Sequence, residues 1–164
     1  MNPRVLTSLR RVEIFAGLTD DQLVRVAGVC KAVQVAADGV IFREGDSGVE
    51  LFVVLEGGVH VMINTRRPDG SVGLSTINSL FNGQCFGETA LLSRATRSAT
   101  VVAAEPTKLL VLREPDFRAL CENDPRIGYR VMRNLAQDLA YKLRSSNLLL
   151  HGNIRWQSDE LGGS

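Results

Sequence analysis

The residues with the clearest chemical pattern lie in one stretch, residues 86–101, which interrupts a region that otherwise favours β-strands. The segment from Gly87 to Leu92 has the length of a single helical turn, and the first amide N–H groups of such a turn attract an anion. Gly87 lets a ligand approach the backbone closely. The guanidinium of Arg97, a few residues further on, can fold back over the same place and pair with a phosphate. The stretch therefore has the composition of an anion-binding site.

Glu88 restricts what that anion can be. Its carboxylate would repel a phosphate unless it faced another part of the ligand, and acids of this kind accept hydrogen bonds from ribose hydroxyls in dinucleotide sites. The acid and Arg97 thus separate a hydroxyl end from a phosphate end, as a nucleotide requires. The simpler alternative is a structural ion pair between Glu88 and Arg97 beside a turn.

Composition excludes several classes of protein. Lys and Arg number 19 against 18 Asp and Glu, so the net charge of +1 does not favour nucleic-acid binding as the main function of the chain. The three cysteines (Cys30, Cys85 and Cys121) form no CxxC pair, which argues against zinc or an iron–sulfur cluster. We expect a small buried residue at Cys85. No signal peptide or membrane span is recognisable, so a cytoplasmic location and no contact with a membrane are expected.

Short helices and then short strands are predicted to position the stretch. Apolar residues recur at helical spacing over 5–15, and Thr19 with Gln22 forms a capping box that begins a helix running to about Cys30. From residue 32 to 112, β-rich runs alternate with glycine-containing turns, a pattern typical of a sandwich or jelly-roll barrel. The expected strands are Val33–Val35, Val40–Phe42, Leu51–Leu55, Val59–Ile63, Val72–Ile77, Thr100–Ala104 and Lys108–Leu112.

The helical period returns after residue 112. Pro115 suits the first turn of a short helix, and Asp124-Pro125 begins a longer one that His151–Asn153 is expected to end. A helix of about 25 residues spans nearly 40 Å, more than packing on a barrel needs. Part of its stripe of apolar residues (Ile127, Val131, Leu135, Leu139 and Leu143) is therefore expected to contact a second copy of the chain. We divide the chain into a barrel with N-terminal helices (1–124), a lid and dimerisation helix (125–151) and a flexible tail (152–164).

The motif Phe-Gly-Glu-x-Ala-Leu-Leu…Arg-Ser-Ala-Thr-Val at residues 86–101, with Gly45-Asp46 and residues 51–57, resembles the cyclic nucleotide-binding domain. This module occurs in the catabolite activator protein, in protein kinase A regulatory subunits and in cyclic nucleotide-gated channels. The resemblance covers roughly residues 10 to 150. It implies a mainly β fold: an eight-stranded jelly-roll (double-stranded β-helix) barrel with short N-terminal helices, a one-turn phosphate-cassette helix and a long C-terminal helix. It also implies cAMP, with cGMP as the alternative ligand, and no metal or other cofactor.

The resemblance further implies a role for each motif residue. Arg97 would pair with the cyclic phosphate, and Glu88 would accept the ribose 2′-hydroxyl. The backbone near Gly87, Thr89 and Ala90 would line the phosphate, Phe86 would precede this turn, and Ser98 would assist the phosphate or the base. On the C-terminal helix, Ser145, Ser146 and Asn147 are candidates for contacting the base. Trp156 would either stack on the base or pack on the barrel.

No catalytic group of residues is recognisable, because neither His60 nor His151 has a promising nucleophile nearby in the sequence. We therefore expect a binding protein and not an enzyme, a sensor that signals through its C-terminal helix to an unknown downstream protein. One alternative is the ligand-sensing part of a catabolite-activator-type transcription regulator, although no DNA-binding region follows the long helix. Another is the regulatory domain of a larger kinase, channel or transporter. A third is a fold that has lost nucleotide binding.

Overall fold

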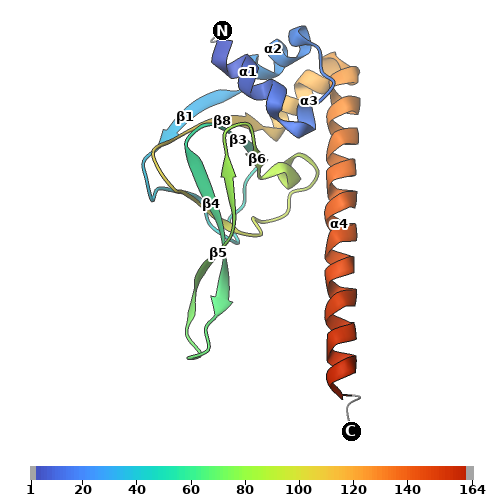
Figure 1. Ribbon diagram of the computed structural model, residues 1–164. Coiled ribbons are helices and arrows are strands. Elements are labelled where there is room, and N and C mark those ends of the chain that lie inside the picture. The colour runs from blue at the N-terminus through green and yellow to red at the C-terminus, as the bar shows by residue number, and fades with distance from the viewer. Residues whose placement is uncertain (1–2, 162–164) are drawn as a thin grey trace.

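The computed structural model describes residues 3–161, and within the last helix the side chains of residue 146 and of residues 148–161 lie outside that description. The chain begins with helices α1 (Pro3–Arg11), η1 (Glu13–Phe15) and α2 (Asp20–Gly28). Eight strands follow, and helices α3 (Glu114–Asn123) and α4 (Pro125–Leu161) complete the order. Figure 1 shows the N-terminal helices and α3 gathered at one end of the strands, where α4 begins.

The capping box at the start of α2 is confirmed. The Gln22 amide donates to Thr19 Oγ1 at 3.3 Å, and the Thr19 amide donates to Gln22 Oε1 at 3.0 Å. The helical pattern over residues 5–15 is divided between α1 and η1, because Val12 adopts an extended conformation with ψ of 116°. This break turns Ile14 and Phe15 into the core, where both are buried.

The strands pair into two antiparallel sheets of four. The first sheet has the order β1-β8-β3-β6, formed by Lys31–Val35, Thr107–Arg113, Glu50–Glu56 and Cys85–Phe86. The second has the order β2-β7-β4-β5, formed by Val40–Phe42, Thr100–Ala103, Gly58–Arg66 and Val72–Phe81. A mainly β fold with eight strands and flanking helices is thus confirmed. The closed barrel stays a prediction, because strand pairing joins the strands into two separate ladders.

Strand β3 connects the two halves of the core, because both of its faces are buried. Leu51, Val53 and Leu55 face a cluster that includes residues of α1, α2, α3 and α4, whereas Phe52 and Val54 face a second cluster with Val59, Val101 and Leu109. Alternation of side chains along a strand produces this division. The continuous apolar run at residues 51–55 is therefore typical of a strand covered on both sides.

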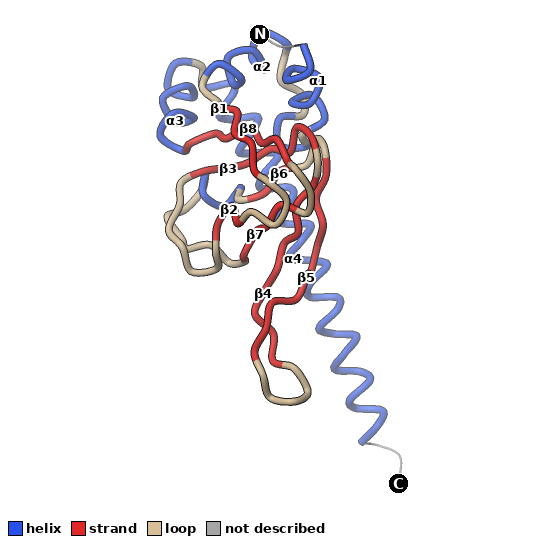
Figure 2. Tube along the Cα trace, turned by 90° about the vertical axis from the view of Figure 1, so that its left-hand side faces the viewer, coloured by secondary structure: helices blue, strands red, loops and turns tan. Residues whose placement is uncertain are grey.

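Helix α4 is only partly covered. Ile127, Val131 and Leu135 are fully buried against the helix-side cluster, whereas Leu143 is 63% exposed. Figures 1 and 2 show α4 passing the sheets and continuing away from them. The helix extends to Leu161, past the expected stop at His151–Asn153, and the division of the chain into barrel, lid helix and tail stays a prediction. Gly152 costs a helix only about 1 kcal/mol, and no proline follows to end it.

The strands β4 and β5 form a long hairpin that projects beyond the rest of the sheets (Figures 1 and 2). Its exposed outer strand is an edge of the second sheet. Within residues 3–161, none of the helices combines the length and the apolar character needed to cross a membrane.

Candidate nucleotide-binding site

The sequence motif folds as a strand, a tight turn and a single turn of 3-10 helix. Strand β6 ends at Phe86, and Gly87 adopts the left-handed conformation with φ of 73°. Turn η2 (Glu88–Leu91) follows, with the Ala90 amide donating to the Gly87 carbonyl at 3.1 Å. Ala90 and Leu91 are buried and fix the turn to the core. The local prediction of a one-turn helix is therefore confirmed, in its 3-10 form.

Arg97 is the most deeply placed cation of this region, only 7% exposed. Its backbone is clamped by the loop before β3, because the Arg97 amide donates to the Asp46 carbonyl at 2.8 Å and the Gly45 amide donates to the Arg97 carbonyl at 2.8 Å. Its guanidinium donates from Nη1 to the Glu50 carbonyl at 2.9 Å and from Nη2 to Glu50 Oε2 at 3.1 Å. The loop 43–48 and β3 together position this side chain.

The third nitrogen of the guanidinium, Nε, differs from the other two. Arg97 Nε is buried and has no hydrogen-bond partner among the described residues. Its Cζ lies 4.3 Å from the centre of the Phe42 ring, a cation–π distance. Burial lowers the pKa of Arg97, and the adjacent Glu50 carboxylate opposes that shift. An unpaired buried N–H costs roughly 1–3 kcal/mol, so the site is suited to an additional acceptor.

Two glycines make room for the guanidinium. A Cβ at Gly87 would lie 2.8 Å from Arg97 Nη1 and 2.9 Å from the Glu50 carbonyl oxygen. A Cβ at Gly48 would also meet the same guanidinium. Gly87 thus serves two purposes, since it provides the positive φ of the turn and the close approach of Arg97.

A cavity of about 230 Å³ opens beside the turn. Six of the seven motif residues predicted to bind a ligand line it: Phe86, Gly87, Glu88, Thr89, Arg97 and Ser98. The seventh, Ala90, is buried behind the turn and anchors it instead. The structure therefore brings together the acid and the arginine that the sequence pattern paired, on the wall of one cavity.

The candidates for contacting a base are less well placed. Ser145 is half-buried and Asn147 is exposed, and neither lines the cavity. The side chains of Ser146 and Trp156 lie outside the described residues. Lys142 is the residue of α4 that reaches the cavity among those whose side chains are described. The helix faces the site one turn earlier than the sequence suggested.

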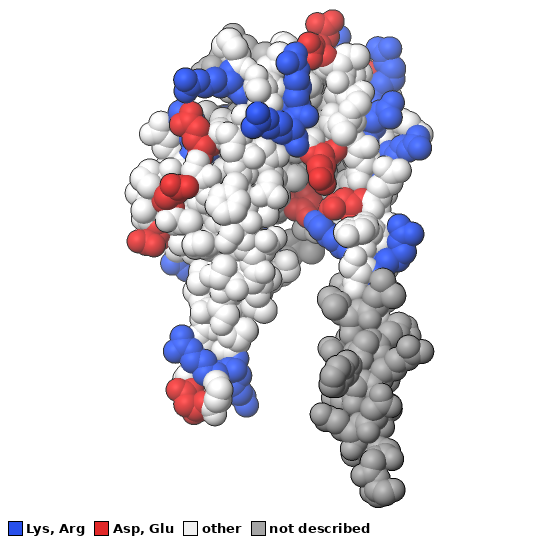
Figure 3. All heavy atoms as spheres, viewed as in Figure 1, with Lys and Arg blue, Asp and Glu red and all other residues white. Residues whose placement is uncertain are grey.

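Lys142 was not anticipated from the sequence, and it pairs with the motif acid. Its Nζ donates to Glu88 Oε1 at 3.1 Å and lies 2.7 Å from Asp138 Oδ2, one turn earlier on α4. Partial burial disfavours the charged amine, but the bonds to Asp138 and Glu88 outweigh it and raise the pKa of Lys142 to about 12. Figure 3 shows acidic and basic side chains meeting where α4 passes the sheets. In the sequence, the i,i+4 spacing of Asp138 and Lys142 was the only local indication of this cluster of ion pairs.

Cys85 also lines the cavity, next to Glu88. Burial, reinforced by the Glu88 carboxylate, raises the pKa of its thiol to about 12. A thiol held protonated in this way is neither a good nucleophile nor a good metal ligand. Within the described residues, no group of three or more His, Cys, Asp or Glu side chains could hold a metal ion.

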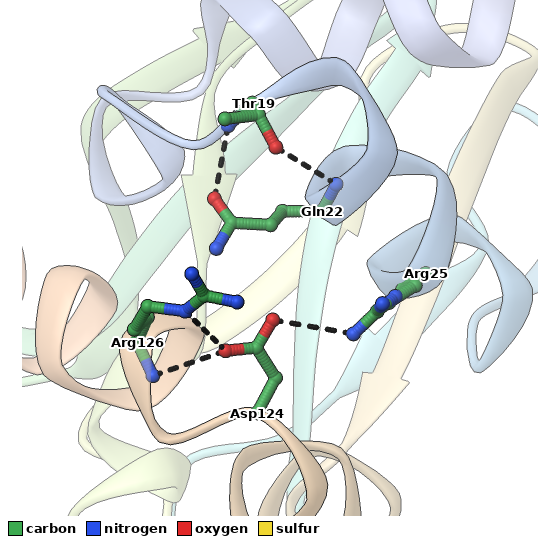
Figure 4. Close-up of polar contacts among 5 residues, drawn as sticks. All are labelled: Thr19, Gln22, Arg25, Asp124 and Arg126. Carbon is green, nitrogen blue, oxygen red and sulfur yellow. Dashed lines mark hydrogen bonds and ion pairs between the residues drawn. The ribbon is translucent and has the colours of Figure 1, made fainter.

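A second polar cluster holds the start of α4. Asp124 is 5% exposed and accepts from Arg25 Nη1 at 3.2 Å and from the amide and Nε of Arg126 at 3.3 and 3.2 Å (Figure 4). Further along α4, Asn134 Nδ2 donates to the carbonyls of Ile14 at 3.0 Å and Ala16 at 2.9 Å. These bonds fasten the first turns of α4 to α2 and η1, at the opposite end from its exposed part.

The family follows from comparison with known proteins. The model of the cyclic nucleotide-binding domain matches residues 32–124, so the chain belongs to this family. The chain is 38% identical over 119 residues to a cyclic nucleotide-gated potassium channel of Mesorhizobium japonicum, covering 71% of this chain and 30% of the channel. It is 37% identical over 110 residues to the cyclic AMP receptor protein of Thermus thermophilus, covering 67% of this chain and 47% of that protein.

A solved structure agrees with these relatives. The crystal structure of a cyclic nucleotide-binding domain from Methylobacillus flagellatus superposes with a TM-score of 0.74 at 25% identity, covering 92% of this chain and 82% of that one. The chain spans less than a third of the length of several curated relatives that it matches, between 22 and 30%. The part that matches the family model is the cyclic nucleotide-binding domain.

Proposed function

We propose that this chain is a cyclic nucleotide sensor that binds cAMP, with the cyclic phosphate on Arg97 and the ribose 2′-hydroxyl on Glu88. The observation that carries the proposal is that Arg97, whose buried Nε has no hydrogen-bond partner among the described residues, lines the same cavity as Glu88. A phosphate oxygen would supply the missing acceptor, and a charge-assisted hydrogen bond of this kind is about twice as strong as a neutral one. The carboxylate of Glu88 would accept from the hydroxyl on the other side of the ring.

We propose cAMP over cGMP because the chain is 37% identical to a protein named as a cyclic AMP receptor. Ser98 lines the cavity next to Arg97 and suits either base. The competing ligand in the test is therefore cGMP.

The signal is proposed to leave through α4. Lys142 on this helix contacts the acid assigned to the ribose, so occupancy of the cavity and the position of α4 are physically connected. A ligand shifts such an equilibrium only to the extent that it binds one position of the helix better than the other. The output would be the exposed part of α4, acting on a second copy of the chain or on a downstream protein in a larger assembly.

The test is a calorimetric titration of the purified chain with cAMP, cGMP and a cyclic dinucleotide. Binding of cAMP with the highest affinity supports the proposal, and Arg97→Ala should weaken it about 10- to 100-fold, since a hydrogen bond to a charged group is lost. Arg94→Ala is the matched control, because Arg94 is an exposed cation of the same loop that does not line the cavity. Absence of binding by all three ligands, or unchanged binding by the Arg97 variant, would refute the assignment.

A further inference from the structure

The contact between Lys142 and Glu88 has a consequence for ligand binding that rests on the proposed function. The two residues are 54 positions apart, and their ion pair joins α4 to the turn η2. The Glu88 side chain is 18% exposed and the Asp138 side chain 26%, so the two carboxylates are partly withdrawn from water, whereas the Lys142 side chain is 56% exposed. The carboxylate that would accept a ribose hydroxyl is therefore already bound by a cation of the same chain.

The position of Lys142 differs from that of the other α4 contacts. Asp124, Ile127, Val131 and Asn134 fasten the first turns of the helix, all N-terminal to Leu135. Among the described side chains beyond Leu135, Leu139 is half-buried against the core and Lys142 pairs with Glu88. The pair thus acts on the part of α4 that is least covered by the core.

The pair also divides the space beside the turn. The cavity that holds Arg97 and a neighbouring cavity of about 270 Å³ are both lined by Glu88 and Lys142. The Lys142 side chain consequently stands on the wall of the proposed ligand site. A ring hydroxyl that approached Glu88 would meet the ammonium group there.

We infer that Lys142 is an intramolecular competitor of the ribose 2′-hydroxyl for the Glu88 carboxylate. Binding of a ribonucleotide displaces Lys142 from Glu88 and frees the adjoining part of α4, while Asp138 retains the ammonium group on the helix. The competition lowers affinity for ligands that carry a 2′-hydroxyl and leaves ligands without one unaffected. Lys142 thereby sets the ligand concentration at which the cavity is occupied. It also links occupancy of the cavity to the position of α4.

Calorimetry with cAMP and with 2′-deoxy-cAMP tests this inference on the wild type and on Lys142→Met. The variant should bind cAMP about two- to fivefold more tightly, the range expected for removal of one partly exposed ion pair. Its affinity for 2′-deoxy-cAMP should stay unchanged, because that ligand does not need Glu88. Lys142→Arg, which keeps the charge, should behave as the wild type. Arg144→Met removes an exposed cation of the same helix that does not line the cavity and should change neither affinity.

The remaining outcomes each contradict the inference. Weaker cAMP binding by Lys142→Met would mean that Lys142 supports the bound state, and equal gains for both ligands would mean a nonspecific effect of charge. No change for either ligand would also overturn the competition. Failure of the wild type to bind any cyclic nucleotide would instead refute the proposed function itself, so the two failures are distinguishable. Amide hydrogen exchange over residues 138–147 gives an independent readout, since the variant without ligand should exchange faster there.

Discussion

Arg97 and Glu50 form a two-point contact, in which Nη1 donates to the Glu50 carbonyl at 2.9 Å and Nη2 to its carboxylate at 3.1 Å. The two residues are 47 positions apart, one at the start of β3 and the other in the loop before β7. This contact holds the guanidinium at the cavity, while Nε has no hydrogen-bond partner among the described residues. Glu50 therefore orients the arginine that the motif supplies.

Glu50→Gln should destabilise the chain without ligand, because it removes the counter-charge of a buried guanidinium. We expect a loss of about 1–3 kcal/mol in the free energy of unfolding, measured with urea. Saturating cAMP should recover more stability in this variant than in the wild type, since a phosphate can replace the lost carboxylate. Glu105→Gln, at an exposed position, is the control. Equal effects of cAMP on both proteins would contradict the orienting role of Glu50.

Gly87→Ala should damage both stability and binding. The residue has φ of 73°, and a Cβ would lie 2.8 Å from Arg97 Nη1. A non-glycine residue in this conformation costs about 1–2 kcal/mol before the steric conflict with Arg97 is included. Thermal unfolding and calorimetry measure the two effects. Gly28→Ala is the matched control: no neighbouring atom lies within 4 Å of its Cβ position, and a gain of about 0.4–1 kcal/mol is expected.

The charge of Asp124 should contribute stability that depends on pH. Although burial opposes it, hydrogen bonding and charge attraction from Arg126 hold the pKa of Asp124 below its ordinary value. A lowered pKa stabilises the folded chain at pH values above about 3.9 and loses that effect as the pH falls through the folded value. Asp124→Asn keeps the helix cap but removes the charge. Its urea stability should be below wild type at pH 7 and approach it near pH 3.

The control for that experiment is Glu122→Gln, which changes an exposed acid two residues earlier. A deficit of Asp124→Asn that stayed constant between pH 3 and pH 7 would show that the aspartate acts through its shape alone.

Self-association through α4 should depend on Leu143, which is 63% exposed on an otherwise leucine-rich face. If the chain dimerises as proposed, Leu143→Glu should shift sedimentation equilibrium towards the monomer. Tyr141→Glu should not, because Tyr141 is similarly exposed, at 67%, but points about 160° away around the helix. A monomeric wild type, or a dimer that Leu143→Glu leaves intact, would remove α4 from the interface.

Local sequence patterns predicted the structural features that depend on residues close together in the chain. The capping box at Thr19, the strand at residues 51–55 and the turn at Gly87 each depend on neighbours within a few positions. The same holds for the grouping of Glu88 with Arg97, which lie nine residues apart in the printed sequence. The two-residue strand β6 was missed because its pairing with β3 is too short to leave a period.

Local patterns could not predict which residues contact the motif residues in the folded chain. Glu50 reaches Arg97 across 47 positions and Lys142 reaches Glu88 across 54, and only the folded sheets and α4 bring them together. The sequence pattern also named Ser145, Ser146, Asn147 and Trp156 as candidates for base contacts, which stay predictions. Among the side chains of α4 that the structure describes, Lys142 is the one that lines the cavity.

The length of α4 gives it a mechanical property as well. Its 37 residues extend about 55 Å from the cluster around Asp124. For a rigid rod of that length, a tilt of only about 5° at the fixed end moves the far end by roughly 5 Å. The helix would therefore work as a lever arm, converting a change of an ångström or less near its pivot into a displacement that a neighbouring protein could detect.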